Sequence, residues 1–322
     1  MLYPLRFDPI FREYIWGGRR LETVLGKTLG DAERYAESWE VVDRAEAQSV
    51  ISAGPWAGRS LSELMSKYPT ELMGAPFAGY DRYPLLFKFL DCNRNLSVQV
   101  HPNDAQGALL DPPDLGKTEA WYVMAVEPGA AIYAGLQQGV DRQTLAEAVA
   151  QGTTAECLHR FEPRAGDCVF IPAGTVHALG EGLVVAEIQQ SSDTTYRLFD
   201  WNRVDADGKP RPLHIHEALD VIDYAQGPVH PQPAASTSQT YRQQLVSCDK
   251  FVLDRVELRD PTQIGGDDRA HLLAVLQGEV VVAGDPCDEP ATKGSTVLIP
   301  ADQGSTLVSP EGTATVLDIY LP

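Results

Sequence analysis

Two potential metal ligands share one face of a short predicted strand. The stretch LSVQVHPND, residues 96–104, alternates apolar and polar side chains, so Gln99 and His101 stand at positions i and i+2. Side chains at this spacing on a strand point to the same face, with their α-carbons roughly 6.5 Å apart. Apolar residues or exposed charges would normally stand there, so an amide and an imidazole on one face predict a polar site.

Two further polar residues extend this set of ligands. Glu119 begins the apolar run EAWYVM, and His177 ends GDCVFIPAGTVH, in which glycines and a proline mark the turns around a short strand. The alternative for His177 alone is a buried histidine after a turn, which we rank below a ligand role. Two imidazoles, a carboxylate and an amide oxygen suit zinc or another borderline divalent metal, whereas calcium or magnesium sites are richer in carboxylates. Room for a water or a substrate oxygen favours a catalytic site over a structural one.

The elements that must position these residues are mostly short strands. Runs such as KFVLDRVEL and DCVFIPAG recur between turns, and the chain contains 27 glycines and 23 prolines. This pattern favours a β-sandwich or β-barrel. Helical periodicity is confined to residues 60–75, residues 141–152 and the segment that starts at His214. We therefore expect a mainly β protein with a small number of accessory helices.

Two parts of the chain resemble each other. AWYVMAVEPGAAIYAG followed by GDCVFIPAGTVHAL parallels HLLAVLQGEVVVAG followed by GSTVLIPADQGSTL, which predicts a duplicated β unit. The second copy has Ser305 where the first has His177, so only the first keeps a potential ligand. A Pro-, Ser- and Thr-rich linker predicts the domain boundary. The expected order is a metal-binding region at 1–225 with a helical insertion near 60–75, the linker at 226–240 and a degenerate β domain at 241–322.

Composition argues against several classes of function. The net charge of −19 opposes binding to nucleic acids and anionic membranes, so an anionic substrate would need a local cluster of Lys and Arg. The five cysteines lack CxxC spacing and are expected to be small buried residues. The stretch MLYPLRFDPIFREY mixes charges into its apolar residues, so we expect no secretory leader, and the longest apolar runs fall far short of about 20 residues. We expect a cytoplasmic protein, a monomer or weak homodimer, that binds a small molecule.

Longer motifs resemble those of the type I mannose-6-phosphate isomerases, members of the cupin superfamily. They are FREYIWGGRRL, YAESWEV, YPLLFKFLD, LSVQVHPND, GKTEAWYV, IPAGTVHAL and GLVVAEIQQSSDTTYRLFDWNR. The resemblance spans most of residues 1–225 and is to the short bacterial form. It implies a double cupin of one catalytic and one degenerate jelly-roll barrel. It also implies a zinc-dependent aldose–ketose isomerase that binds one Zn²⁺ per chain and interconverts mannose 6-phosphate and fructose 6-phosphate.

The resemblance also assigns residues. It implies that zinc binds to the four ligands already named, and it adds Arg197 as the catalytic arginine and Lys117 as a residue of the active site. The reaction moves a proton between two carbons through a cis-enediol, so two adjacent oxygens need charge stabilisation and one base carries the proton. Zinc would stabilise the oxygens as a Lewis acid. Arg197 would contact either a developing oxyanion or the phosphate.

Other roles stay open at this stage. We rank Lys117 and Glu187 ahead of a zinc-bound hydroxide as the base. Alternatively, Lys117 is a solvated loop residue, and Glu187 is a buried partner that orients a ligand or the catalytic arginine. Trp16 either belongs to the core or lines the sugar pocket. His214 and His216 precede a predicted helix, so we expect them to cap it or lie on the surface.

Two alternative functions compete with the isomerase. A non-catalytic, metal-dependent sugar-binding or regulatory module would be favoured if Arg197 or Lys117 were absent, and both are present. A metal oxygenase would normally use histidines and a carboxylate on one side of the metal, with open positions for dioxygen. The amide of Gln99 and the sugar-phosphate motifs argue against an oxygenase.

Overall fold

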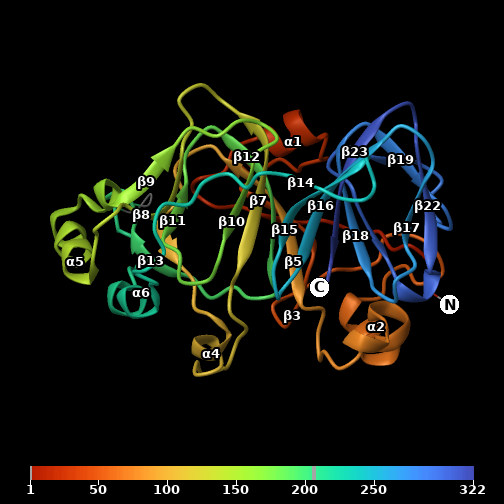
Figure 1. The fold of residues 1–322 in the computed structure, drawn as a ribbon, viewed down its shortest axis with the longest axis horizontal. Coiled ribbons are helices and arrows are strands. Elements are labelled where there is room, and N and C mark those ends of the chain that lie inside the picture. The colour runs from red at the N-terminus through yellow and green to blue at the C-terminus, as the bar shows by residue number, and fades with distance from the viewer. Residues whose placement is uncertain (1, 205–207) are drawn as a thin grey trace.

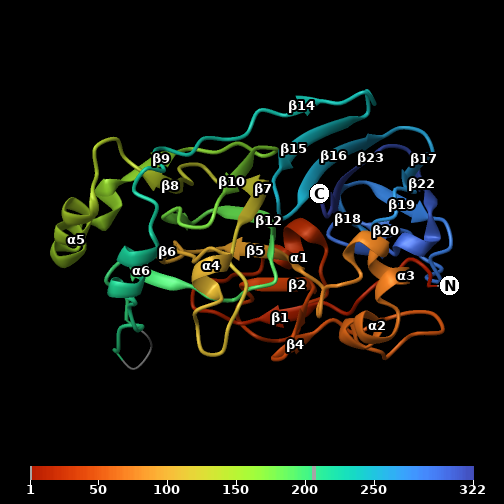
Figure 2. The ribbon, with the colours of Figure 1, turned by 60° about the horizontal axis from the view of Figure 1, so that its bottom comes forward.

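Strands dominate the computed structural model, which describes residues 2–204 and 208–322 (Figures 1 and 2). The predicted fold class, mainly β with accessory helices, is confirmed. Two pairs of sheets lie side by side along the long axis of the molecule, the C-terminal pair in blue (Figure 1). In the described part of the chain, no helix has both the length and the apolar character that crossing a membrane requires.

The first pair of sheets contains the predicted ligands. Sheet 1 is built, in spatial order, from β1 (Ile10–Arg12), β2 (Glu37–Val41), β5 (Leu85–Cys92), β12 (Leu183–Gln190), β7 (Glu119–Val126) and β10 (Cys168–Ile171). Sheet 2 is built from β13 (Tyr196–Phe199), β6 (Val98–Val100), β11 (His177–Leu179), β8 (Ile132–Leu136) and β9 (Leu158–Phe161). Neighbouring strands pair antiparallel in both sheets.

The central strand of sheet 1, β5, is buried along its whole length because both of its faces are covered. Phe87 and Phe89 pack in a core shared with Phe251 and Leu253 from the C-terminal pair of sheets. Leu90, on the opposite face, packs in the core between sheets 1 and 2. A strand covered on both faces reads as an almost continuous apolar run, which explains the sequence LLFKFLDC. The one lysine in this run therefore has to be accommodated inside the protein.

The second pair of sheets repeats the first. Sheet 3 is ordered β14 (Ala235–Ser236), β15 (Arg242–Ser247), β16 (Val252–Leu258), β23 (Ala314–Tyr320), β18 (His271–Gln277) and β21 (Thr296–Ile299). Sheet 4 is ordered β17 (Thr262–Gly265), β22 (Ser305–Pro310), β19 (Glu279–Val282) and β20 (Ala291–Thr292). Ser305 begins β22 just as His177 begins β11, so the predicted duplication of a β unit is confirmed.

Two short segments cross the predicted domain division. β14 lies inside the stretch 226–240 that the sequence predicts as a linker, and it pairs with β15. Near the N-terminus, Leu5 forms a bridge with Leu298 of β21, so the start of the chain lies against the C-terminal sheets. β3 (Asp43–Arg44) and β4 (Ala47–Gln48) form a separate two-stranded sheet.

The helices fill the edges and the outer faces of the sheets. The predicted insertion near residue 60 forms α2 (Leu61–Lys67), α3 (Pro69–Met73) and the 3₁₀ turn η1 (Ala75–Phe77). α2 and α3 lie below the C-terminal sheets in Figure 2 and share their core. α5 (Arg142–Gln151) and α6 (Ile215–Val221) cover the outer face of sheet 2. The remaining turns of helix are α1 (Arg20–Leu25), α4 (Asp104–Gly107), η2 (Thr154–Cys157) and η3 (Ala301–Gln303).

A cluster of charges is centred on sheet 3, and its members Asp254, His271 and Asp318 are buried. Nη1 of Arg242 is 2.7 Å from a carboxylate oxygen of Asp254 and 2.7 Å from one of Asp318. His271 lies 2.7 Å from Asp318 through Nδ1 and 3.0 Å from Asp267 through Nε2. Burial disfavours the imidazolium, but the charge of Asp318 and the hydrogen bonds to both aspartates outweigh it and raise the pKa of His271 to about 9.

We expect protonated His271 to stabilise the fold in a pH-dependent way. Because its folded pKa exceeds that of the unfolded chain, about 6.5, its stabilisation is complete below about pH 6.5 and is lost as the pH rises through about 9. The difference in unfolding free energy between wild type and His271→Asn, measured with urea, should fall by about 3 kcal/mol between pH 6 and pH 9.5. The exposed His216→Asn should leave this profile unchanged. An equal difference at both pH values would contradict a charged His271.

Candidate metal centre and active-site pocket

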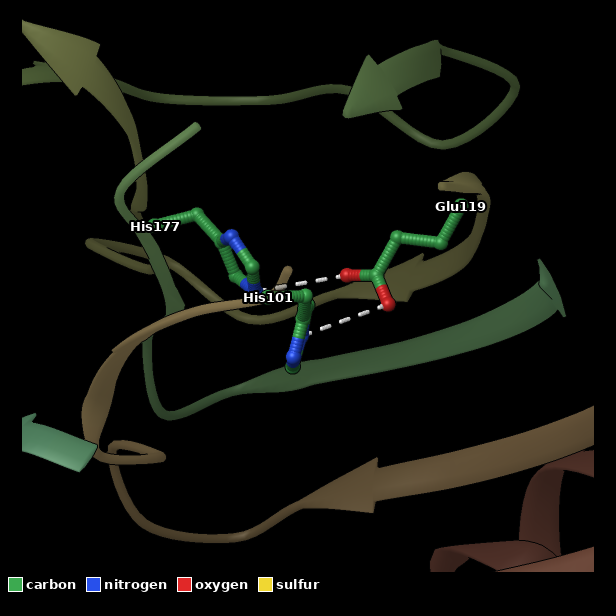
Figure 3. A group of neighbouring side chains, drawn as sticks. All are labelled: His101, Glu119 and His177. Atoms are coloured by element: carbon green, nitrogen blue, oxygen red, sulfur yellow. Dashed lines mark ion pairs between the residues drawn. The ribbon is translucent and has the colours of Figure 1, made fainter. Parts of the chain in front are cut away.

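Three of the four predicted ligands meet in the gap between sheets 1 and 2 (Figure 3). His101 follows β6 and His177 begins β11, both in sheet 2, whereas Glu119 begins β7 in sheet 1. Oε1 of Glu119 is 3.3 Å from Nε2 of His177, and Oε2 of Glu119 is 3.7 Å from Nε2 of His101. All three side chains are buried. Their ligand atoms all lie within 4.8 Å of one another, as a shared metal ion would require.

Backbone carbonyls fix the orientation of both imidazoles. Nδ1 of His101 lies 3.0 Å from the carbonyl oxygen of Thr194, and Nδ1 of His177 lies 2.9 Å from that of Thr175. Because a carbonyl only accepts, each Nδ1 carries the proton and each Nε2 keeps a lone pair directed at the cluster. Hydrogen bonds of this kind orient metal-binding histidines in proteins.

The electrostatics of the cluster favour a cation. Burial, with a contribution from Lys117, lowers the pKa of His177 to about 3 and that of His101 well below its usual value, so both rings are neutral. Burial also raises the pKa of Glu119. Among the described residues, Oε1 of Glu119 is a buried oxygen that lacks a hydrogen-bond partner. An unpartnered carboxylate oxygen that faces the lone pair of an imidazole nitrogen fits a divalent metal placed between them.

Gln99 lies beside these ligands, as the alternation of its strand predicts. Its neighbours Val98 and Val100 pack on the outer face of sheet 2, so Gln99 and His101 point into the gap between the sheets. In the sheet, Gln99 stands opposite His177 on one side and Arg197 on the other. Its amide nitrogen is 3.3 Å from Nε2 of His177. A half-turn of the amide would bring its oxygen to the same place, so Gln99 is within reach as the fourth ligand.

A cavity of about 300 Å³ opens next to the cluster. The other predicted site residues, Trp16, Lys117, Glu187 and Arg197, all line it. Lys117 reaches furthest toward the ligands: its Nζ donates to Oε2 of Glu119 and lies 3.0 Å from Nε2 of His101. The structure therefore brings every predicted site residue to one place.

Lys88 and Glu37 also line the cavity, and sequence reasoning missed both. Nζ of Lys88, on β5, lies 3.5 Å from Glu37 and 3.5 Å from Glu187. Burial opposes the charge of Lys88, but these two carboxylates outweigh it and raise its pKa. The sequence did contain a signal for this pair, namely a lysine inside a continuous apolar strand. A buried charge needs a partner of opposite sign, so such a lysine predicts a nearby carboxylate.

Glu187 contacts Lys88 rather than a metal ligand or Arg197. Nε1 of Trp121 also donates to its Oε1 over 2.9 Å. Burial raises the pKa of Glu187, but the charges of Lys117 and Lys88 outweigh it and lower the pKa. The cavity thus has an ionised carboxylate in its wall.

Arg197 differs from the other cations of the cavity. Lys88, Lys117 and Arg211 are paired with carboxylates, whereas Arg197 forms no ion pair within the described residues. Its Nη1 donates to the carbonyl oxygen of Pro212 over 2.9 Å, and its buried Nε has no hydrogen-bond partner there. The backbone amide of Arg197 donates to Nδ1 of His214 over 3.2 Å, so this imidazole supports β13 instead of capping α6.

The charged residues of sheet 3 stand at positions equivalent to those of charged residues of sheet 1 in and beside the cavity. Glu119 pairs with Ile171 in sheet 1, and His271 pairs with Ile299 in sheet 3. By the same registers, Asp318 stands in the place of Glu187, Asp254 in that of Lys88 and Arg242 in that of Glu37. The second copy thus has polar side chains at all four positions, but these side chains form ion pairs with one another.

Comparison with known proteins gives a consistent result. A family model described as the phosphomannose isomerase type I catalytic domain matches residues 5–122. Mannose-6-phosphate isomerase ManA of Bacillus subtilis is 36% identical over 305 residues, which cover 94% of each chain. The mannose-6-phosphate isomerase of Streptococcus mutans is 35% identical over 280 residues, 87% of this chain and 86% of that protein.

Solved structures agree in fold. The crystal structure of the mannose 6-phosphate isomerase from Bacillus subtilis matches with a TM-score of 0.89 and 28% identity, and the match covers 99% of both chains. A putative mannosephosphate isomerase from Archaeoglobus fulgidus shares the fold with a TM-score of 0.77 and 23% identity, over 99% of this chain and 97% of the other. As its motifs predict, the chain therefore belongs to the family of type I mannose-6-phosphate isomerases.

Proposed function

We propose that this chain is a zinc-dependent isomerase that interconverts mannose 6-phosphate and fructose 6-phosphate through a cis-enediol. One observation carries the proposal: Glu119 and two neutral imidazoles converge beside the cavity, and Oε1 of Glu119 faces Nε2 of His177 at 3.3 Å without a hydrogen-bond partner in the described chain. A bound metal would satisfy that oxygen and the lone pairs of the two imidazoles. Arg197, the cavity cation that has no carboxylate partner in the described chain, would attract a phosphorylated sugar. Membership of the family supports this choice of substrate.

The four predicted ligands suit zinc, at one ion per chain. Nε2 of His101, Nε2 of His177, a carboxylate oxygen of Glu119 and the amide oxygen of Gln99 would hold it. This mixture of nitrogen and oxygen donors fits a borderline metal better than it fits calcium or magnesium. When bound, zinc would supply Lewis-acid stabilisation of negative charge on the sugar oxygens.

The contacts of the two candidate bases suggest different tasks for them. Glu187 is held ionised in the cavity wall, so it can accept the proton from one carbon and return it to the next. Lys117 is ion-paired with Glu119, so its ammonium group is placed to donate a hydrogen bond to a sugar oxygen. Lys88 would keep Glu187 in place, since it binds that carboxylate from within β5.

The remaining residues of the cavity would position the substrate. Arg197 is the cation without a carboxylate partner in the described chain, so it is available to the phosphate or to a developing oxyanion. Trp16, stacked on Tyr14, would form part of the wall against the sugar. The five free cysteines suit the reducing cytoplasm. For the oligomeric state, we keep the prediction made from the sequence, a monomer or weak homodimer.

The first test is turnover itself. The zinc-loaded protein, supplied with mannose 6-phosphate, should form fructose 6-phosphate, and a chelator should abolish this activity because the ligands alone cannot stabilise the charge on the sugar oxygens. Adding one equivalent of zinc should restore it. The product is measured with a coupled enzymatic assay. Binding of the sugar phosphate without turnover would instead identify a non-catalytic binding module.

Substitution of Glu119 tests the metal centre. Glu119→Gln keeps the shape of the side chain but removes its charge, so we expect zinc binding to weaken by more than about 100-fold, beyond the usual effect of an outer-shell change. Isothermal titration calorimetry with zinc measures this. The matched control is Glu127→Gln, which changes a largely exposed glutamate that pairs with Arg20. Unchanged zinc affinity in Glu119→Gln would remove Glu119 from the ligand set.

Substitution of Arg197 tests its role in catalysis. Arg197→Ala should lower kcat/KM by about 100-fold or more, because a half-buried cationic donor to developing charge is lost. The zinc content should stay at one ion per chain. A lower kcat would indicate a contact made in the transition state, and a higher KM alone would indicate a phosphate contact made throughout. Arg34→Ala, at an arginine that pairs with Glu33 and does not line the cavity, is the control. Wild-type kinetics in Arg197→Ala would exclude both roles.

A further inference from the structure

Asp114 lies outside the cavity but is hydrogen-bonded to the loop that holds a metal ligand. Its Oδ2 accepts from Oγ of Ser192 over 3.1 Å and from Oγ1 of Thr194 over 3.2 Å. The carbonyl of the same Thr194 is the acceptor for Nδ1 of His101. Two consecutive hydrogen bonds, joined by one residue, thus link the carboxylate of Asp114 to the imidazole of His101.

Two arginines keep this carboxylate charged and in place. Oδ1 of Asp114 accepts from Nη2 of Arg82 over 2.7 Å, and Nη1 of Arg44 lies 3.2 Å from the same oxygen. Burial opposes the charge, but the hydrogen bond from Arg82 and the charge of Arg44 outweigh it and lower the pKa of Asp114 to about 2. Nη1 of Arg44 also donates to the carbonyl oxygen of Ser191 over 2.9 Å. The arginines therefore hold both Asp114 and the loop at residues 191–195.

Asp114 also begins the segment that leads to Glu119. Its Oδ1 accepts from the backbone amide of Leu115 over 2.9 Å, so the turn before Lys117 is fixed by the same side chain. In the opposite loop, Asp193 and Thr195 stand on either side of Thr194, and both line the cavity. Asp114 therefore joins two loops. The loop at residues 191–195 orients His101, and the loop at residues 114–118 carries Lys117 toward the ligands.

We propose that Asp114 is a positioning residue of the metal centre: through Thr194, it holds His101 in the orientation that binds metal. This inference rests on the proposed metal-dependent function. Without the carboxylate, the hydroxyls of Ser192 and Thr194 lose their acceptor, and the carbonyl that receives Nδ1 of His101 is no longer fixed. An imidazole without its outer partner binds metal more weakly, typically by about 10- to 100-fold.

The decisive measurement is zinc affinity, read by competition with a chromogenic chelator. Asp114→Asn keeps the size of the side chain but loses the charge and one acceptor, so we expect its zinc dissociation constant to rise by about tenfold. The matched control is Asp91→Asn, because Asp91 is likewise ion-paired with an arginine, with Nε of Arg20 at 2.8 Å, but does not contact the loop at residues 191–195. The control should keep the wild-type affinity. Wild-type affinity in Asp114→Asn would overturn the proposal.

A double-mutant cycle separates positioning from general destabilisation. Thr194→Val removes the hydroxyl that donates to Asp114 but leaves the carbonyl of residue 194, both arginines and the hydrogen bond from the amide of residue 194 to Oγ of Ser192. We expect this variant to weaken zinc binding about as much as Asp114→Asn does, and adding Asp114→Asn to it should cost little more, because both changes break the same contact. If the two effects simply add, Asp114 acts elsewhere and the proposal fails.

These measurements do not depend on turnover. If the wild type binds zinc but does not convert mannose 6-phosphate, the proposed isomerase function fails, while the affinities still show whether Asp114 positions His101. If the wild type turns over and Asp114→Asn binds zinc normally, the isomerase stands and the positioning role falls. Either result therefore identifies which of the two proposals is wrong.

Discussion

A carboxylate buried opposite two neutral imidazoles, in the gap between two sheets, is the constraint on which the rest of the catalytic region depends. Glu119 belongs to sheet 1, and His101 and His177 to sheet 2, so the ligands come together only while the two sheets face each other in this register. Burying unpaired acceptors is costly. The carbonyls that orient the rings, the ammonium of Lys117 and the ion pairs behind the cavity all serve to keep this arrangement in place.

The parts of the site that follow strand periodicity could be predicted from the sequence. Gln99 and His101 share a face because alternation on a strand is a local property, and the structure places them as expected. Glu119 and His177 were predicted from the ends of apolar runs and from turn residues, which are also local signals. The duplicated unit was recognised from similar strings of residues, and the order of strands confirms it. The roles of these residues in catalysis remain proposals.

Contacts that depend on tertiary structure could not be predicted. Lys88 stands in a strand whose two faces are both covered, and only the pairing of β2, β5 and β12 shows that it lies between Glu37 and Glu187. The hydrogen bond from His101 to Thr194 uses a backbone carbonyl. Because every residue has one, the identity of residue 194 does not predict this hydrogen bond. The same limit applies to His214, whose ring accepts from a backbone amide across a loop.

The charged cluster of the C-terminal sheets limits which substitutions that half of the chain can tolerate. Arg242, Asp318 and His271 hold one another in the places where the first copy has its cavity wall. Replacing any one of them would leave an opposite charge buried without its partner, at a cost of several kcal/mol. Introducing a functional site there therefore requires several coordinated substitutions, so the C-terminal sheets are protected against gaining one by single mutations.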